Sequence, residues 1–81
     1  MPDHDNPQAV QELVREVALW CSQQIRAEQQ AGVPDAQRME QLKAELAVCG
    51  ADLQSLRGAE PQEVDRIGER YAARLKELGG Q

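Results

Sequence analysis

The sequence predicts an all-α protein of three helices, and three observations support this prediction. Ala, Glu, Gln, Leu and Arg are abundant, and these side chains lose little conformational freedom in a helix. Proline-containing breaks at residues 31–34 and 58–61 separate three stretches with helical spacing of apolar residues. No stretch alternates as a half-buried strand does. We therefore expect one helical domain over residues 7–78, with tails at 1–6 and 79–81.

The first helix is expected from about Pro7 to about Gln30. Asn6 suits the N-cap position, and proline suits the first helical position because its missing amide would have no partner there. An apolar stripe repeats about every 3.6 residues, and Gln24 and Glu28 interrupt it near its end. The stripe consists of Val10, Leu13, Val14, Val17, Cys21 and Ile25.

The second helix is expected over residues 35–57 and has the most regular apolar pattern. Its apolar steps are 3, 4, 3, 4 and 3, an a/d seam of the coiled-coil type. Gly32 suits a left-handed C-terminal cap of the first helix, and Asp35 suits the N-cap of the second. So short a connection predicts an antiparallel helical hairpin. The seam consists of Met39, Leu42, Leu46, Cys49, Leu53 and Leu56.

The third helix is expected over residues 61–78, with Pro61 at its first position. Two arrangements fit this pattern. The third helix can close a monomeric three-helix bundle, or the hairpin can pair with a second copy to form a four-helix core. We expect the homodimer, because an aliphatic hairpin alone is marginally stable and the seam is long. The apolar side of this helix consists of Val64, Ile67, Tyr71, Leu75 and Leu78.

Charge and composition narrow the function. A net charge of −5 disfavours nucleic acid and anionic membranes as partners. No apolar run reaches membrane-spanning length and the N-terminus lacks the signal-peptide pattern, so we expect a cytoplasmic protein. No histidine lies in an expected helix, and neither a nucleophile elbow nor a glycine-rich phosphate loop is present. We therefore expect a protein that is not an enzyme and needs no cofactor.

The two cysteines, Cys21 and Cys49, both lie on apolar stripes. Buried free cysteine is the ordinary interpretation, because thiols in cytosolic proteins stay reduced and pack as small hydrophobic groups. A redox pair stays open, since the antiparallel hairpin brings the two residues within about one helical turn of each other. A metal site would need more ligands, and the only histidine is His4 in the N-terminal tail.

Arg66, Arg70 and Arg74 recur at every fourth residue of the third helix, and such a stripe needs an answering charge. Glu63 and Glu77 lie three residues from the outer two arginines and can pair with them. The acidic face of the hairpin, an acidic protein partner or a phosphate-bearing ligand are the alternatives. The stripe therefore supports a second hypothesis, a sensor of nucleotides or other small anions.

The main hypothesis is a non-enzymatic module that binds another protein, and it names four contact residues. Trp20 lies beside the first apolar stripe, where it either covers the rim of the bundle or anchors a partner. Glu40, Glu45 and Asp52 belong to the acidic hairpin face, which could compete for a basic surface of the partner. A small transcriptional regulator of the anti-sigma or antitoxin kind is the most specific version.

The second expected helix carries a Leu-x-x-Glu-Leu-x-x-Cys pattern followed by Leu and Arg, at Leu42, Glu45, Leu46, Cys49, Leu53 and Arg57. This pattern resembles the second helix of a family of short, uncharacterised actinobacterial helical-hairpin proteins. The match covers about residues 10–58, and it departs from the family at Gly50, where members carry Trp. The resemblance implies a helical hairpin and no particular activity, because the family has none that is settled.

Read from Glu45, the same region has Cys49, Asp52, Leu56 and Glu60 at intervals of 4, 3, 4 and 4. These intervals resemble the ligand helix of the actinobacterial hairpin anti-sigma factor that binds cyclic di-GMP. That helix carries Glu, Ser, Arg, Gln and Asp, so only Glu45 matches it. The resemblance implies a shared scaffold that has lost this ligand, since an acidic residue replaces the phosphate-binding arginine.

Overall fold

A computed structural model describes residues 7–79 and confirms the all-α fold. Its helices are α1 at Pro7–Gln30, α2 at Ala36–Leu56 and α3 at Pro61–Gly79. These bounds agree with the expected ranges to within one residue at each end. No strand occurs in the described range, and the N-cap expected at residue 6 lies outside it.

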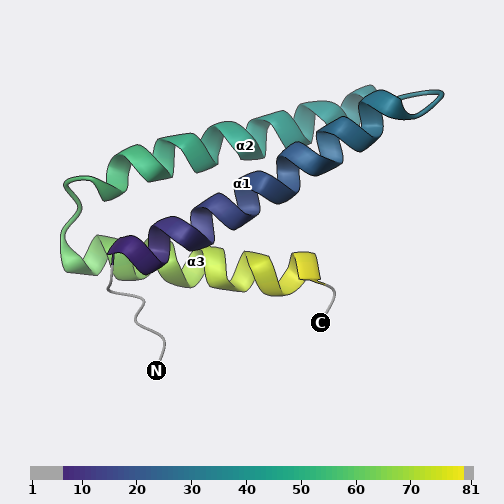
Figure 1. Cartoon of the computed structure of the whole chain (residues 1–81). Coiled ribbons are helices and arrows are strands. Elements are labelled where there is room, and N and C mark those ends of the chain that lie inside the picture. The colour runs from purple at the N-terminus through teal and green to yellow at the C-terminus, as the bar shows by residue number, and fades with distance from the viewer. Residues whose placement is uncertain (1–6, 80–81) are drawn as a thin grey trace.

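α1 is the helix on which the other two pack (Figure 1). α2 returns antiparallel to α1 and forms the hairpin, and α3 then runs alongside the first part of α1. α3 ends well before the tip of the hairpin, so the hairpin projects beyond it. The described chain is correspondingly elongated and flat, with extents of 45 × 27 × 15 Å. The third helix therefore docks on its own hairpin, as the three-helix arrangement predicted.

The apolar stripes of all three helices meet in one core, which uses the α2 seam within the chain. Three seam residues are buried, and Leu46 and Leu53 pack half-buried against the core. Fully burying such side chains contributes about 1.5–3 kcal/mol each. No residue from 22 to 41 is buried. The buried core consists of Val10, Val14, Val17, Cys21, Leu42, Cys49, Leu56, Val64, Ile67 and Tyr71.

The turn between α1 and α2 differs from the expected cap. Gly32 does not adopt the left-handed conformation, so the prediction of a left-handed glycine cap is wrong. The amide of Ala31 instead donates to the carbonyl oxygen of Glu28 at 3.1 Å. The Glu28 carboxylate then accepts from the amide of Asp35 at 3.0 Å, which ties the end of α1 to the start of α2. A side chain therefore stabilises the turn where we expected a glycine.

Asp35 is the N-cap of α2, as expected. Its carboxylate accepts from the amides of Gln37 at 3.0 Å and Arg38 at 3.2 Å, two of the donors that a helix start leaves without partners. Pro61 likewise takes the first position of α3. Asp35 and Pro61 thus mark the starts of α2 and α3, as the sequence predicted.

The interruption of the α1 stripe coincides with the end of the cover that α3 provides. Arg38 of α2 reaches across the hairpin, where its Nη2 donates to Gln24 Oε1 at 3.4 Å and its Nε lies 3.6 Å from Glu28 Oε2. We call residues 22–41 the arm, because none of them is buried. In the arm, polar side chains thus make contacts between α1 and α2.

Candidate functional site

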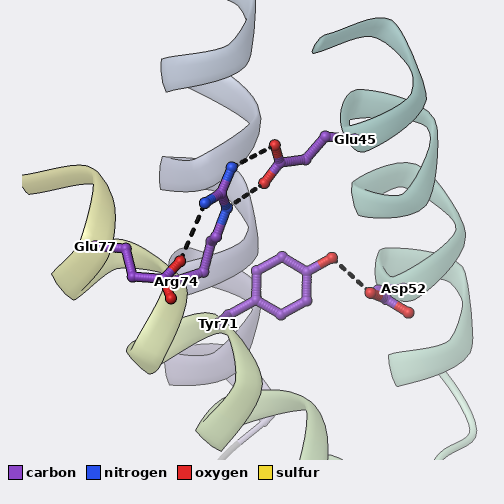
Figure 2. A network of polar contacts seen from close by, with 5 residues as sticks. All are labelled: Glu45, Asp52, Tyr71, Arg74 and Glu77. Carbon is purple, nitrogen blue, oxygen red and sulfur yellow. Dashed lines mark hydrogen bonds and ion pairs between the residues drawn. The ribbon is translucent and has the colours of Figure 1, made fainter. Parts of the chain in front are cut away.

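A polar network joins α2 to α3 across the bundle (Figure 2). The Arg74 guanidinium donates twice to the Glu45 carboxylate, from Nε to Oε2 at 2.5 Å and from Nη2 to Oε1 at 2.7 Å. Its Nη1 also donates to Glu77 Oε1 at 3.1 Å. A two-point contact between guanidinium and carboxylate is the strongest geometry such a pair has. Arg74 therefore fixes the spacing between α2 and α3.

Asp52, two helical turns along α2 from Glu45, makes the second connection to α3. Its Oδ2 accepts from the Tyr71 hydroxyl at 2.5 Å and from Arg70 Nη2 at 2.8 Å (Figure 2 shows the tyrosine contact). The tyrosine ring is buried in the core while its hydroxyl reaches the edge. The carboxylate thus satisfies the one polar atom that this ring carries.

Trp20 belongs to this part of the molecule and lies at the rim of the bundle. Its side chain is half-buried against the core, and the Arg74 guanidinium carbon lies 6.0 Å from the centre of its ring. Such a cation–π contact contributes about 0.5–1 kcal/mol at a partly exposed site. Arg74 therefore contacts side chains from all three helices.

The network shifts the pKa values of three of its residues, Glu45, Arg74 and Tyr71. The hydrogen bond from Arg74 lowers the pKa of Glu45, so this carboxylate stays ionised at neutral pH. The same contact raises the pKa of Arg74. Burial, and then the hydrogen bond to Asp52, raise the pKa of the Tyr71 hydroxyl. Glu45 and Arg74 are thus held in their charged forms, and the Tyr71 hydroxyl is held in its protonated form.

Cys21 and Cys49 are free thiols, and both are buried. Burial, and then the negative charge of Glu45, raise the pKa of Cys21 to about 11. Burial also raises the pKa of Cys49. A reactive cysteine needs a lowered pKa and exposure, and these two thiols have neither. This environment favours the ordinary interpretation, two cysteines that pack as small hydrophobic groups.

Residues 7–79 contain no group of three or more potential metal ligands. His4, the only histidine, lies outside this range. In the same range no helix is long and apolar enough to cross a lipid bilayer.

The arginine stripe of α3 is paired within the chain. Arg66 Nη1 lies 3.4 Å from Glu63 Oε1, so both intrahelical pairs that the spacing predicted are present. Arg70 and Arg74 additionally take Asp52 and Glu45 of the hairpin as partners. An anion that bound this stripe would have to displace these carboxylates.

The residues predicted to contact a partner lie in different environments. The side chains of Glu45 and Asp52 are only 25% and 16% exposed to solvent, because they point toward α3. We expected both on an outer acidic face of the hairpin. In the structure they instead pair with Arg74 and Arg70 of α3. Glu40 is exposed on α2, and no ion pair within residues 7–79 engages it. Of the acidic candidates, Glu40 alone has the accessibility that was expected.

Trp20 lines a surface hollow of about 420 Å³ between α1 and the end of α3. Leu75 and Leu78 form its α3 side, and Leu19, which is 58% exposed, lies beside the indole. Glu16 is its only charged residue. Apolar side chains thus form most of the wall of this hollow.

A second apolar surface lies on α2 and was missed by sequence reasoning. Between the a/d residues, α2 exposes five small or uncharged side chains over three turns. Val48 among them is 52% exposed. We call this set the α2 outer face: Ala44, Ala47, Val48, Ala51 and Ser55. Its spacing could have been recognised, but the stronger seam on the opposite side of the helix dominated the pattern.

Comparison of the chain with known protein families finds no match. Curated proteins and solved structures likewise give no match.

Proposed function

We propose that this chain is a non-enzymatic helical module for protein–protein interaction, and that the α2 outer face binds a second copy of the chain. The observation that carries the proposal is a solvent-exposed helix face without a single charge. Exposed helix faces normally carry charged residues, as those of α1 and α3 do. Small side chains around a half-exposed valine let another helix pack closely against this face.

The small, uncharged side chains of the α2 outer face suit a second copy of the chain as the occupant. Two chains of net charge −5 repel each other unless their contact avoids acidic residues. The α2 outer face has none, and its alanines allow two helix axes to approach to about 8 Å. Glu40 is the acidic residue next to this face. A two-fold antiparallel contact keeps the two copies of Glu40 at opposite ends.

The test is molar mass by light scattering after size exclusion, at several protein concentrations. The wild-type chain is expected to approach about 18 kDa, twice the 9.0 kDa of one chain. Ala47→Glu with Ala51→Glu places four carboxylates in the contact and is expected to leave a monomer. Ala27→Glu, on an exposed position of the arm, is the matched control and should not change the mass. A wild-type mass of 9.0 kDa at every concentration would show the proposed contact to be wrong.

The more specific version of the function is a cytoplasmic regulator of transcription of the anti-sigma or antitoxin kind. It is supported by the net charge of −5, which suits competition for a basic surface. We place its partner contact at the Trp20 hollow. An amphipathic helix fits there best, because an apolar anchor would meet Leu75 and Leu78 while a basic flank would meet Glu16.

Leu19→Asp tests this second contact without disturbing the core, because Leu19 is mostly exposed. Binding of a basic amphipathic peptide is expected to change Trp20 fluorescence in the wild-type protein and to be lost in the variant. Val33→Asp, at the exposed tip of the hairpin, is the control. If both variants bind the peptide equally, the hollow is not the contact.

A further inference from the structure

We propose that the hollow between α1 and α2 binds a phosphoryl group of a small phosphorylated ligand. This hollow has a volume of about 280 Å³ and lies on a different side of the bundle from the Trp20 hollow. It is lined by Gln11, Arg15, Gly50, Leu53, Gln54 and Arg57. The inference is independent of the proposed protein contact, because none of these residues belongs to the α2 outer face.

The charged side chains that line this hollow are both positive. Arg15 of α1 and Arg57 at the end of α2 both line the hollow, and no carboxylate does. In residues 7–79 neither arginine has an ion-pair partner, whereas Arg38, Arg66 and Arg74 all do. Two unmatched guanidinium groups from different helices thus meet at one concave place. This is unusual in a chain whose net charge is −5.

Two acidic residues lie close to this arrangement and have to be considered. Glu12 and Glu16 line a separate hollow with Arg15 on the outer side of α1. The Arg15 side chain can therefore turn either toward these carboxylates or toward the hollow. Arg57 lines only the hollow without an acidic residue, so its positive charge stays available to a ligand there.

Gly50, within the continuous helix α2, also lines this hollow. Glycine within a helix is destabilising relative to alanine, so its presence needs a reason. Packing does not provide one, because a Cβ built at Gly50 would meet nothing within 4 Å. The residue is exposed and lines the hollow together with the two arginines. Its missing side chain leaves room for a ligand to approach the α2 backbone.

The donors of the hollow select a phosphoryl group over a carboxylate. Guanidinium groups bind carboxylate and phosphate through paired N–H donors, and each fork can occupy two oxygens. Two forks, together with the side-chain amides of Gln11 and Gln54, exceed what one carboxylate can accept. A phosphoryl group offers three terminal oxygens and up to two negative charges. The volume equals about nine water molecules at ~30 Å³ each, so it also admits a small organic remainder.

The experiment is NMR titration of the isotope-labelled chain with pyrophosphate and, separately, with ADP at constant ionic strength. In the wild-type protein we expect saturable shifts of the amides around Gly50 and Arg57. Arg57→Gln should weaken pyrophosphate binding about ten-fold or more, since it removes one charged fork. Arg66→Gln, an exposed arginine of the α3 stripe, is the matched control and should bind as the wild type does.

Gly50→Ala separates ligand binding from folding, because the two effects have opposite signs. Alanine raises the melting temperature through its higher helix propensity, and its methyl group weakens binding by occupying the hollow. Wild-type shifts that do not saturate by about 10 mM pyrophosphate would overturn the inference. Equal affinity of Gly50→Ala and the wild type would do the same, as would equal losses in Arg66→Gln and Arg57→Gln. Tighter binding of ADP than pyrophosphate would identify a nucleotide, and equal binding a phosphoryl group alone.

The Ala47→Glu/Ala51→Glu variant distinguishes this inference from the proposed dimer. If it stays monomeric and still binds pyrophosphate, the two surfaces act independently. If wild type and variant are both monomeric and both bind, only the dimer proposal has failed.

Discussion

The two ends of the hairpin are built from the same two helices and differ in what covers them. Every buried residue of α1 lies at or before Cys21, and every buried residue of α2 lies at or after Leu42. α3 covers this end with Val64, Ile67 and Tyr71. In the arm, residues 22–41, nothing is buried. One end of the hairpin is thus packed under α3, and the other end consists of α1 and α2 alone.

The difference shows how far a third helix determines what the other two require. Two helices can bury one stripe each, and side chains beside that stripe stay in contact with water. In the arm, a hydrophobic side chain beside the stripe would expose apolar surface to water. These positions are therefore taken by polar residues, Gln24, Glu28 and Arg38. The sequence of α1 changes from valine to glutamine and glutamate where α3 ends. The point at which the stripe of α1 becomes polar thus matches the point at which α3 ends.

The largest effect is expected from one substitution made at each end. Ile67→Ala, in the covered core, should lower the free energy of unfolding by about 2–4 kcal/mol, because it leaves a cavity beside buried valines. Ile25→Ala, in the arm, should lower it by about 1 kcal/mol or less, because Ile25 is only half-buried. Urea denaturation followed by circular dichroism measures both. Equal losses would mean that the arm is packed as tightly as the core.

The next largest effect concerns the polar network that holds α3 on the hairpin. Glu45→Gln removes the charge that Arg74 grips and should cost about 1–2 kcal/mol at pH 7, reduced by partial exposure. Because the folded-state pKa of Glu45 is lowered, the unfolded chain binds its proton first as pH falls. The wild-type advantage is therefore full above the ordinary value of 4.5 and is lost as pH falls through the folded-state pKa.

Comparing unfolding free energies of both proteins between pH 7 and pH 3 checks this expectation. Glu40→Gln, at an exposed position of the same helix, is the control and should change stability by at most ~0.5 kcal/mol at any pH. A gap between Glu45→Gln and wild type that stayed constant down to pH 3 would show that ionised Glu45 does not hold α3.

An effect of comparable size, confined to alkaline pH, is expected from the thiols of the covered end. The pKa of Cys21 is raised from 9.0 to about 11, so the unfolded chain loses this proton first. Stability should be complete below pH 9 and should fall as pH rises toward 11, by up to ~1.4 kcal/mol per pH unit and group. Burial also raises the pKa of Cys49, so Cys21→Ala should reduce the slope of stability against pH without abolishing it. An unchanged slope would contradict the buried, protonated thiol.

Local signals explain why the element boundaries could be predicted from sequence. Pro7, Asp35 and Pro61 act within one turn of their own position, so no long-range information is needed to interpret them. The Gly32 cap failed for a related reason. The turn depends on a hydrogen bond from Asp35 to Glu28, seven residues earlier, and glycine propensity does not report on such a contact.

The candidate site could be predicted only where it is local. The pairs Glu63–Arg66 and Arg74–Glu77 follow from a spacing of three residues on one helix. The contacts of Glu45 and Asp52 with α3 depend on how α3 docks, which helical spacing leaves undetermined. The Trp20–Arg74 contact brings together residues 54 positions apart, from 20 to 74. Helix docking therefore turned Glu45 and Asp52 from the expected outer acidic face toward α3, while Glu40 stayed exposed.

The smallest effect in free energy is the sharpest test of the contrast between the two ends. Arg38→Ala removes the cross-hairpin contacts of the arm and should lower global stability by at most ~0.5 kcal/mol, because the contacts are long and partly exposed to solvent. Hydrogen exchange of the arm amides should nevertheless accelerate several-fold, while amides from Val10 to Cys21 keep their protection. Local opening and global unfolding separate in this way only if α3 stabilises the covered end independently of the arm. Equal acceleration in both ends would instead make the hairpin a single cooperative unit, in which the polar closure of the arm supports the core.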